Sequence, residues 1–385
     1  MIRLTISLRN IYMLLIQTNR DALLKPLQSV IGIVERRHTL PILSNILIEK
    51  NGENLSVIAT DLEIQITATS ICQDEFPDFS VTASAKKLQD ICRAFPEDSK
   101  IALEKDDSRL QIKVGKSRFN LQTIPANDFP ILVPSGENRS YLKTTQKTLK
   151  NLLNLVQYAM AQQDIRYYLN GLLLVVESKL LRVVATDGHR LGMACSLLEN
   201  AEEIEEGSPQ EVILPRKTVI ELIKLLADSD EEVTIETGQN QTRFSFSNVV
   251  LVSKIVEGKF PDYNRVIPSD YQNHIQIDRI LLLQSLQRAS ILSNEKFRGV
   301  RLVLTQNSLR IICNNNEQEE AQEEIEVSYV GEPLDIGFNV NYLLDVLTNL
   351  NNASITLSFG DANSSGLFTI PDNECFKYVV MPMRI

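Results

Sequence analysis

Apolar and polar residues alternate in a pattern that recurs three times along this chain. In each copy, an apolar strand with every second residue polar leads into a polar turn, as expected for a strand with one buried face. Asp61, Asp187 and Asn315 take the same place in the three turns. Steps of 126 and 128 residues separate these positions, so three repeats of this length fill the chain.

Each repeat also contains two segments with apolar residues at helical spacing. The upstream segments are 21–37, 146–160 and 278–292, and the downstream segments are 84–95, 215–227 and 339–350. Pro215 is expected in the first turn of its helix, and Asn51-Gly52 predicts a hairpin between two strands. Helix, strands, helix, strands describes an α+β domain with antiparallel sheets.

The repeats predict three domains, at residues 1–137, 138–269 and 270–385. Met13 begins a strand-like stretch and is a candidate natural start, so residues 1–12 are expected to be an extension. Arg9 and Asn10 interrupt the apolar N-terminus, which argues against a signal peptide.

Composition narrows the class of protein. The 385 residues include five cysteines without CxxC spacing, which fits reduced thiols in a cytoplasmic protein. No apolar run approaches the roughly 20 residues of a membrane span. The net charge of −10 argues against a general nucleic-acid coat, but not against a protein that gathers its basic residues on one surface.

Positive charge does gather on the predicted helices, whereas acidic runs begin at Ala201 and Glu317, in a loop and at strand edges. One reading is that these are ordinary solvated helix faces; the other is a basic helical surface that follows a phosphate backbone without reading bases. The basic residues of these helices include Arg20, Lys25, Arg36, Arg37, Lys86, Lys87, Arg93, Lys147, Lys150, Arg216, Lys217, Lys224, Arg279 and Arg288.

Asp187-Gly188-His189-Arg190 has the residue types of a catalytic site, but its context argues against one. There is no G-x-S-x-G nucleophile motif, and the histidines His38, His189 and His274 are too far apart in sequence for a simple metal motif. Gly115-Lys116-Ser117 ends like a P-loop, yet the glycine expected five positions earlier is Leu110, so a tight hairpin is predicted instead. No metal or cofactor is expected.

The repeats provide an internal comparison for this stretch. Ala-Thr-Asp occurs in the first two repeats, which predicts that the Asp side chain accepts hydrogen bonds from local backbone amides and stabilises the turn. The next three residues differ: LEI, GHR and NEQ. Gly188 to Arg190 therefore serve something particular to the second repeat. A second unusual feature is the C-terminal KYVVMPMRI, in which Tyr378–Val380 fits a last strand and the methionines fit an adaptable contact surface.

With these features in order along the chain, the sequence resembles the bacterial DNA polymerase III β subunit family, the sliding clamps. The segments that carry the resemblance are RRHTLPILSNIL, YYLNGLLL, VVATDGHRL, FPDYNRVIP, SNEKFRGVRL, IGFNVNYLLDVL and YVVMPMRI, and only residues 1–12 fall outside it. The resemblance implies a clamp fold of three domains, closed as a homodimer into a six-domain ring around duplex DNA, with helices lining the hole. It implies a non-catalytic processivity factor.

The resemblance also implies DNA-contacting and interface residues. Arg37, Gln163, Tyr167 and Tyr168 match DNA contacts of the family, and the broader electrostatic candidates are Lys86, Lys87, Lys147, Lys150, Arg216 and Lys217. Phe119 and Leu121 of one chain, with Ile291 and Leu292 of the other, match its apolar dimer contacts.

The family's second site is a groove between domains two and three that receives short peptides from the polymerase III α subunit, the clamp-loader δ subunit, other polymerases and repair factors. Leu191, Val266, Val380 and Met381 are expected to form its apolar pocket, with His189 and Arg190 holding polar groups. The full set is Leu169, Thr186, Gly188, His189, Arg190, Leu191, Pro261, Arg265, Val266, Val380, Met381, Pro382, Met383 and Arg384. Two alternatives stay open: an enzyme that uses Asp187 and His189, and a structural solenoid of three repeats that does not close into a dimer.

Overall fold

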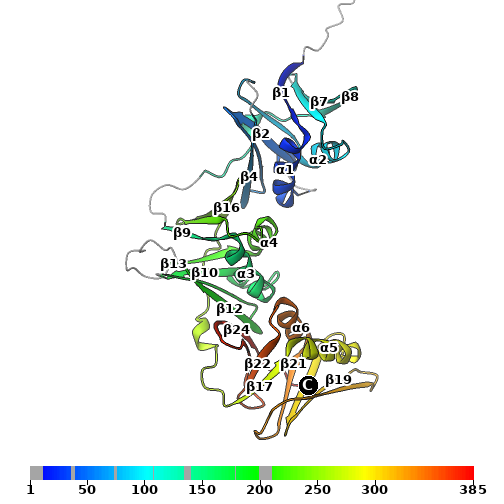
Figure 1. Ribbon diagram of the computed structural model, residues 1–385, viewed down its shortest axis with the longest axis vertical. Helices are drawn as coiled ribbons and strands as arrows, with labels where there is room; N and C mark the ends of the chain where they lie inside the picture. The colour runs from blue at the N-terminus through cyan, green and yellow to red at the C-terminus, as the bar shows by residue number, and fades with distance from the viewer. Residues whose placement is uncertain are drawn as a thin grey trace, which may run out of the picture. The chain divides into compact units, whose positions relative to one another are not determined.

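A computed structural model describes residues 12–35, 40–72, 76–106, 108–133, 140–177, 179–198 and 210–385. The chain forms two units, which are described separately. Unit 1 contains residues up to Leu142 together with Glu231–Lys254, and unit 2 contains Lys143–Asp230 and Ile255–Ile385 (Figure 1). The predicted extension, apart from Tyr12, and Arg37 lie outside the described residues.

Every segment with helical spacing contains a helix. The helices are α1 (Arg20–Val30), α2 (Ala85–Arg93), α3 (Gln146–Val156), α4 (Arg216–Leu225), α5 (Arg279–Ala289) and α6 (Val340–Asn349). Helix α1 is shorter than expected, since the chain passes into a 3-10 turn at Ile31–Ile33. Pro215 lies one residue before α4, as its N-cap with an extended backbone, and not in the first turn.

Unit 1 contains two antiparallel sheets. Their orders are β1-β6-β7-β8 and β5-β2-β3-β4-β16-β15-β14-β9, with β9 at the boundary of the unit. The strands are β1 (Met13–Asn19), β2 (Asn45–Asn51), β3 (Asn54–Thr60), β4 (Ile64–Ile71), β5 (Phe79–Ser84), β6 (Lys100–Lys105), β7 (Arg109–Val114), β8 (Ser117–Gln122), β9 (Ser140–Thr145), β14 (Glu232–Thr237), β15 (Gln241–Phe246) and β16 (Val249–Lys254).

Unit 2 also contains two antiparallel sheets, ordered β13-β10-β11-β12-β24-β23-β22-β17 and β20-β19-β18-β21. The strands are β10 (Gly171–Glu177), β11 (Leu180–Thr186), β12 (Arg190–Leu197), β13 (Gln210–Pro215), β17 (Asn273–Asp278), β18 (Gly299–Thr305), β19 (Ser308–Asn314), β20 (Glu320–Glu326), β21 (Leu334–Asn339), β22 (Ser354–Phe359), β23 (Gly366–Ile370) and β24 (Asn373–Val380). Strand β24, from the end of the chain, pairs with β12 of the second repeat, so that Arg190 lies opposite Val380.

Two predicted hairpins are present. Asn51 pairs with Asn54 around Gly52, whose φ is +57°. Val114 pairs with Ser117 around Gly115, whose φ is +56°. Glycine reaches this left-handed region without the steric cost of a Cβ. The Gly-Lys-Ser stretch is therefore the turn between β7 and β8, and the hairpin prediction is confirmed.

The helices of each repeat pack in pairs, α1 on α2, α3 on α4 and α5 on α6. Each first helix covers the strands that flank the Thr-Asp or Asn turn; for example, α3 packs on β11 and β12. Figure 1 shows α5 and α6 next to each other in unit 2. Buried side chains alternate along strands such as β19, where Leu309, Ile311 and Cys313 face the core. The predicted α+β class with antiparallel sheets is confirmed.

Candidate functional site

The repeated Thr-Asp turn is a structural device, as the comparison between repeats predicted. One Asp187 carboxylate oxygen accepts hydrogen bonds from the His189 and Arg190 amides, at 2.8 and 3.0 Å. In the first repeat, Asp61 accepts from the Glu63 and Ile64 amides at 2.9 and 2.7 Å.

The third repeat keeps this device with an asparagine. Asn315 accepts from the amides of Glu317 and Glu319, each at 3.0 Å. Such a side chain satisfies backbone donors where the strand pairing stops. The residue after the aspartate has a positive φ in the first two repeats, +76° at Leu62 and +89° at Gly188. The turn therefore belongs to the fold in all three repeats.

Arg190 is held by groups that lie far apart in the sequence. Its guanidinium donates to Asp187 Oδ2 at 3.0 Å, to Asp345 Oδ2, and to the Tyr158 carbonyl at 2.6 Å. It also lies over the Tyr342 ring, 4.5 Å from the centroid. Only 10% of the Arg190 side chain is exposed. Its guanidinium thus connects β12 and the 3-10 turn after α3 (Gln157–Ala159) to α6 of the third repeat.

The C-terminal segment lies beside this turn. The Met381 amide donates to the His189 carbonyl at 2.8 Å, so residues 192 positions apart are adjacent. Further on, the Met383 amide donates to the Gly337 carbonyl at 2.8 Å. A Cβ at Gly337 would lie 2.4 Å from the Met383 carbonyl oxygen and 2.8 Å from Ile385, which shows how closely the tail approaches β21. The tail is thus an ordered edge next to the turn.

The expected apolar pocket is largely covered. Leu191 and Val380 are 2% and 0% exposed, and Val266 packs as a half-buried residue against the cluster that contains Leu191. Met381 keeps 37% of its surface exposed. Among these four residues, Met381 and Val266 offer the accessible apolar surface, while Leu191 and Val380 lie beneath it.

The remaining groove residues differ in exposure. Leu169 and Thr186 are buried, Pro382 and Met383 are half-buried, and Gly188, His189, Pro261, Arg265 and Arg384 are exposed. The Thr186 hydroxyl donates to the Arg190 carbonyl at 2.6 Å, which is part of the turn itself. The 14 predicted groove residues all belong to unit 2.

Two side chains that the sequence reading did not select also face this surface. Arg166 donates to the Asp187 carbonyl at 3.2 Å, and a Cβ at Gly188 would lie 3.0 Å from its guanidinium. Its hydrogen bond to Asp164 is the main reason that the pKa of Asp164 is lowered to about 2. Tyr342, beneath Arg190, is the other. In the sequence, Arg166 directly precedes Tyr167, a predicted DNA contact, and Tyr342 lies in the segment IGFNVNYLLDVL that carries the family resemblance. Nothing else in the sequence pointed to these two residues.

A cavity of about 430 Å³ adjoins the turn. Its lining includes His189, Arg190, Asp164, Arg216 and Tyr342. The Asp187 carboxylate is engaged by two amides and by Arg190, so the hydrogen bonds do not resemble a triad in which an aspartate orients a histidine. No group of His, Cys, Asp and Glu in the described part of the chain could hold a metal ion.

The residues predicted to contact DNA are distributed over both units. In unit 2, Gln163 is exposed, and Tyr167 and Tyr168 form a 3-10 turn with their rings 5.9 Å apart at the centroids. Tyr167 is 57% exposed. The loop glycine Gly258 lies next to both tyrosines. These three side chains lie within one short stretch, as expected for a shared contact surface.

The basic residues predicted to attract DNA differ in solvent exposure and in ion pairing. Lys87 and Lys147 are exposed on α2 and α3. Lys86 pairs with Asp90 at 3.7 Å and Lys150 with Asp228 at 3.4 Å. Arg216 and Lys217 are half-buried, and the Arg216 guanidinium donates to the Met160 carbonyl at 3.3 Å.

The predicted dimer residues lie on or beside edge strands. Phe119 and Leu121 belong to β8, the edge of the four-stranded sheet of unit 1. Ile291 and Leu292 form the 3-10 turn after α5, which packs on β20, an edge of the four-stranded sheet of unit 2. Ile291 is 77% exposed and Leu292 is half-buried, while Leu121 is 9% exposed.

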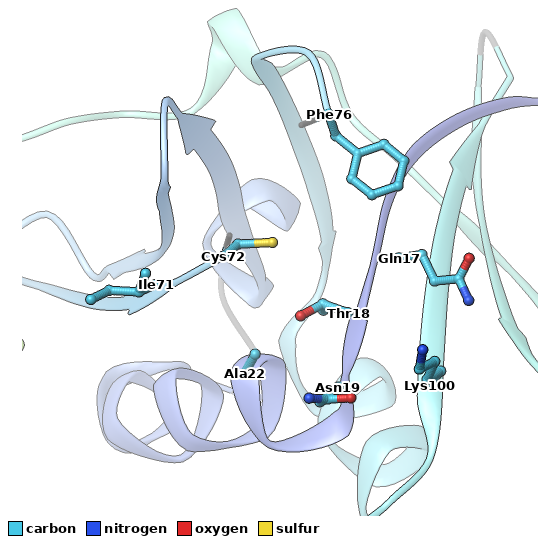
Figure 2. Close-up of a pocket in the computed structure, with 8 residues that line it drawn as sticks. All are labelled: Gln17, Thr18, Asn19, Ala22, Ile71, Cys72, Phe76 and Lys100. Atoms are coloured by element: carbon cyan, nitrogen blue, oxygen red, sulfur yellow. The ribbon is translucent and has the colours of Figure 1, made fainter. Parts of the chain in front are cut away.

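A separate cavity of about 570 Å³ lies in unit 1 between β1, the start of α1 and the end of β4 (Figure 2). Thr18, Asn19, Cys72 and Lys100 are among its lining residues. Among the described residues that line it there are a lysine and a thiol but no carboxylate, and none of them belongs to the predicted DNA, peptide or dimer sites.

The fold therefore defines a protein of three α+β repeats, and comparison with known proteins establishes its family. Models of the DNA polymerase III beta subunit match throughout: the N-terminal domain at residues 14–133, the central domain at 143–262 and the C-terminal domain at 264–384. The chain belongs to the DNA polymerase III beta subunit family, the sliding clamps, which are non-catalytic factors of DNA replication.

Individual relatives agree. The chain is 47% identical to a beta sliding clamp of Pseudomonas aeruginosa over 366 residues, which cover 95% of this chain and 98% of the relative. It is 43% identical to the beta sliding clamp of Escherichia coli K12 over 367 residues, with the same coverage. A crystal structure of a Pseudomonas aeruginosa sliding clamp superposes with a TM-score of 0.92 at 45% identity, covering 97% of this chain and 100% of the other. None of the helices that the structure describes is long and apolar enough to cross a membrane.

Proposed function

We propose that this clamp encircles duplex DNA as a head-to-tail homodimer in the cytoplasm and tethers replication proteins through a groove beside the turn at Asp187. The observation that supports the groove most directly is the hydrogen bond from the Met381 amide to the His189 carbonyl. It brings together the two stretches that the repeats do not share, the Gly-His-Arg turn and the methionine-containing tail. The partners of the groove would be the polymerase III α subunit, the clamp-loader δ subunit, other polymerases and repair factors.

The groove residues support a division of roles. The exposed His189 and Arg265 are placed to meet polar groups of a peptide, and Met381 to cover an apolar side chain. Arg190 keeps the turn and α6 in place through bonds within the protein. Few apolar contacts and a large ordering cost give weak, exchangeable binding, on the order of micromolar. Partners could then replace one another on one ring.

A matched pair of methionine variants tests the groove. Met381→Ala removes accessible apolar surface from the groove and is expected to weaken a fluorescent polymerase α-subunit peptide by about 1–2 kcal/mol, or ~5–30-fold. Met13→Ala changes a 62% exposed methionine in unit 1 and should leave the affinity unchanged. Equal affinities for the two variants in fluorescence polarization would contradict the groove.

The edge strands support the dimer. Strand β8 carries Arg118 and follows Lys116, while β20 carries the exposed Glu320, Glu324 and Glu326. Opposite charges on two strand edges favour pairing between chains in one register. Apolar residues on each side, Phe119 and Ile291 among them, would be covered by this pairing.

Light scattering tests the dimer and the open solenoid alternative together. The wild-type mass should be twice the 43.5 kDa of one chain. Ile291→Asp should give monomers, whereas Leu197→Asp, at a 73% exposed position on β12, should remain dimeric. A wild-type monomer at micromolar concentration would contradict the proposal and favour the solenoid.

DNA would contact the basic helices and the tyrosine turn through its backbone. Lys87, Lys147 and Tyr167 are exposed, so these side chains can contact the phosphate backbone without recognising bases. Arg37, Gln163 and Tyr168 complete the proposed set of contacts. Weaker electrostatic contributions are expected from residues that are half-buried or already form ion pairs within the chain, namely Lys86, Lys150, Arg216 and Lys217. Ring closure would retain DNA even when each contact is weak.

A further inference from the structure

Two cysteines face each other across the strand pair β12 and β24. The register places Ala194 opposite Phe376, and the next position along each strand is Cys195 and Cys375. Directly opposed residues of antiparallel strands have Cα atoms about 4.5–5.5 Å apart. A disulfide requires about 4.4–6.8 Å between Cα atoms. A pair that continues this register meets the distance requirement without a rearrangement of the backbone.

This pair is also the accessible one. Cys195 and Cys375 are each half-buried, whereas Cys72, Cys92 and Cys313 are buried. A cavity of about 370 Å³ next to the pair is lined by Cys195, Met193 and Lys377, among others. It gives a small disulfide reagent space to approach.

The two thiols are in contact, and their surroundings affect the reactivity of Cys195. Burial, and then a hydrogen bond with the Cys375 thiol, raise the pKa of Cys195 to about 12, although Arg182 and Lys377 act in the opposite direction. Thiolate is the attacking species in exchange, so this shift slows attack by Cys195 at neutral pH.

We propose that Cys195 and Cys375 form a reversible thiol–disulfide site whose co-reactant is a small oxidised thiol of the glutathione type. One of the two sulfurs attacks the small disulfide, forming a mixed disulfide and releasing one small thiolate, which takes up the proton of the attacking thiol. The other sulfur then displaces the second small thiolate and passes its proton to it. Two protein thiols are oxidised to one disulfide, and one small disulfide is reduced to two thiols. The site does not depend on the proposed clamp function.

The expected consequence is a covalent connection between the second repeat and the end of the chain. Strand β12 carries Arg190 and Leu191, and β24 carries Val380, so the bridge would join the two strands that border the groove. A bridge that closes a loop of about 180 residues restricts the unfolded chain strongly. Oxidation should therefore raise the unfolding temperature of unit 2.

The test uses the full chain incubated with oxidised glutathione and mapped by mass spectrometry without reduction. The expected result is one linked peptide pair containing Cys195 and Cys375, with the loss of two hydrogen atoms, reversal by dithiothreitol and a higher midpoint of thermal unfolding. Cys195→Ser should stop at the mixed disulfide, with glutathione retained on Cys375. Stable glutathione adducts on the wild type without the link, or links to other cysteines, would overturn the proposal. No reaction of the folded chain, under conditions that modify the unfolded chain, would also overturn it.

Discussion

Two arginines of the proposed groove provide a direct test of how the site is held. Arg190 is 10% exposed and bonds Asp187, Asp345 and the Tyr158 carbonyl. Arg265 is 86% exposed and, among the residues that the structure describes, its ion pair is with Asp262, at 2.9 Å. Replacement by methionine keeps the aliphatic stem of each and removes the charge. Arg190→Met should therefore destabilise the protein, whereas Arg265→Met should not.

The magnitude follows from the partners that would be left behind. Hydrogen bonds to charged groups contribute about 1.5–3 kcal/mol each. The Asp345 side chain is 42% exposed and would regain water, so the total is reduced to about 2–4 kcal/mol. For a unit of this size, that corresponds to a fall of roughly 5–12 °C in the midpoint of unfolding. A surface ion pair such as Arg265–Asp262 contributes about 0–1 kcal/mol.

Thermal unfolding followed by circular dichroism measures both variants. If Arg190→Met failed to fold, Asp345→Asn would remove one partner only and should give a smaller loss in the same direction. Equal unfolding temperatures for Arg190→Met and Arg265→Met would refute the assignment of Arg190 as the residue that joins β12 to α6.

Three further predictions concern single groups. Gly188→Ala should cost about 1–2 kcal/mol in urea unfolding, because φ is +89° there and a Cβ would press on Arg166; an unchanged midpoint would contradict the strain. Tyr158→Phe should be neutral or stabilising by up to about 1 kcal/mol, because the buried Tyr158 hydroxyl has no hydrogen-bond partner among the described residues; a loss of several kcal/mol in the same assay would show that this hydroxyl is bonded. The pKa of Asp164 is lowered from 3.8 to about 2, so its contribution is present above about pH 4 and is lost as the pH falls towards 2. Asp164→Asn should therefore flatten the acid side of the stability profile, and a profile parallel to wild type below pH 4 would exclude this role.

Much of the fold follows from local patterns. The six α-helices of the described residues, two tight hairpins and the role of Asp61 and Asp187 could be predicted because each depends on residues a few positions apart. The internal comparison of LEI, GHR and NEQ separated the turn from its variable residues. The prediction that Pro215 lies in the first turn of its helix was wrong by one residue, because its backbone is extended and the helix begins at Arg216.

The site was less predictable, because its contacts connect distant residues. Arg190 was predicted to hold polar groups of a peptide, which stays a prediction; its bond to Asp345 spans 155 positions and has no local signal. The same holds for the packing of Tyr342 beneath it and for the contact between the Cys195 and Cys375 thiols, which lie just beyond the paired residues of β12 and β24. Burial of Leu191 and Val380 also follows from the assembled sheet and not from their neighbours in sequence.

Topological retention on DNA tests the central proposal most directly. The protein would be loaded by a clamp loader onto nicked circular DNA, washed in high salt and then exposed to a restriction enzyme that linearises the circle. A closed ring held by topology should remain on the circle through the wash and leave once ends are available, because salt screens contacts with phosphates but does not open the ring. Loss during the wash, or retention that is the same on circular and linear DNA, would contradict the account.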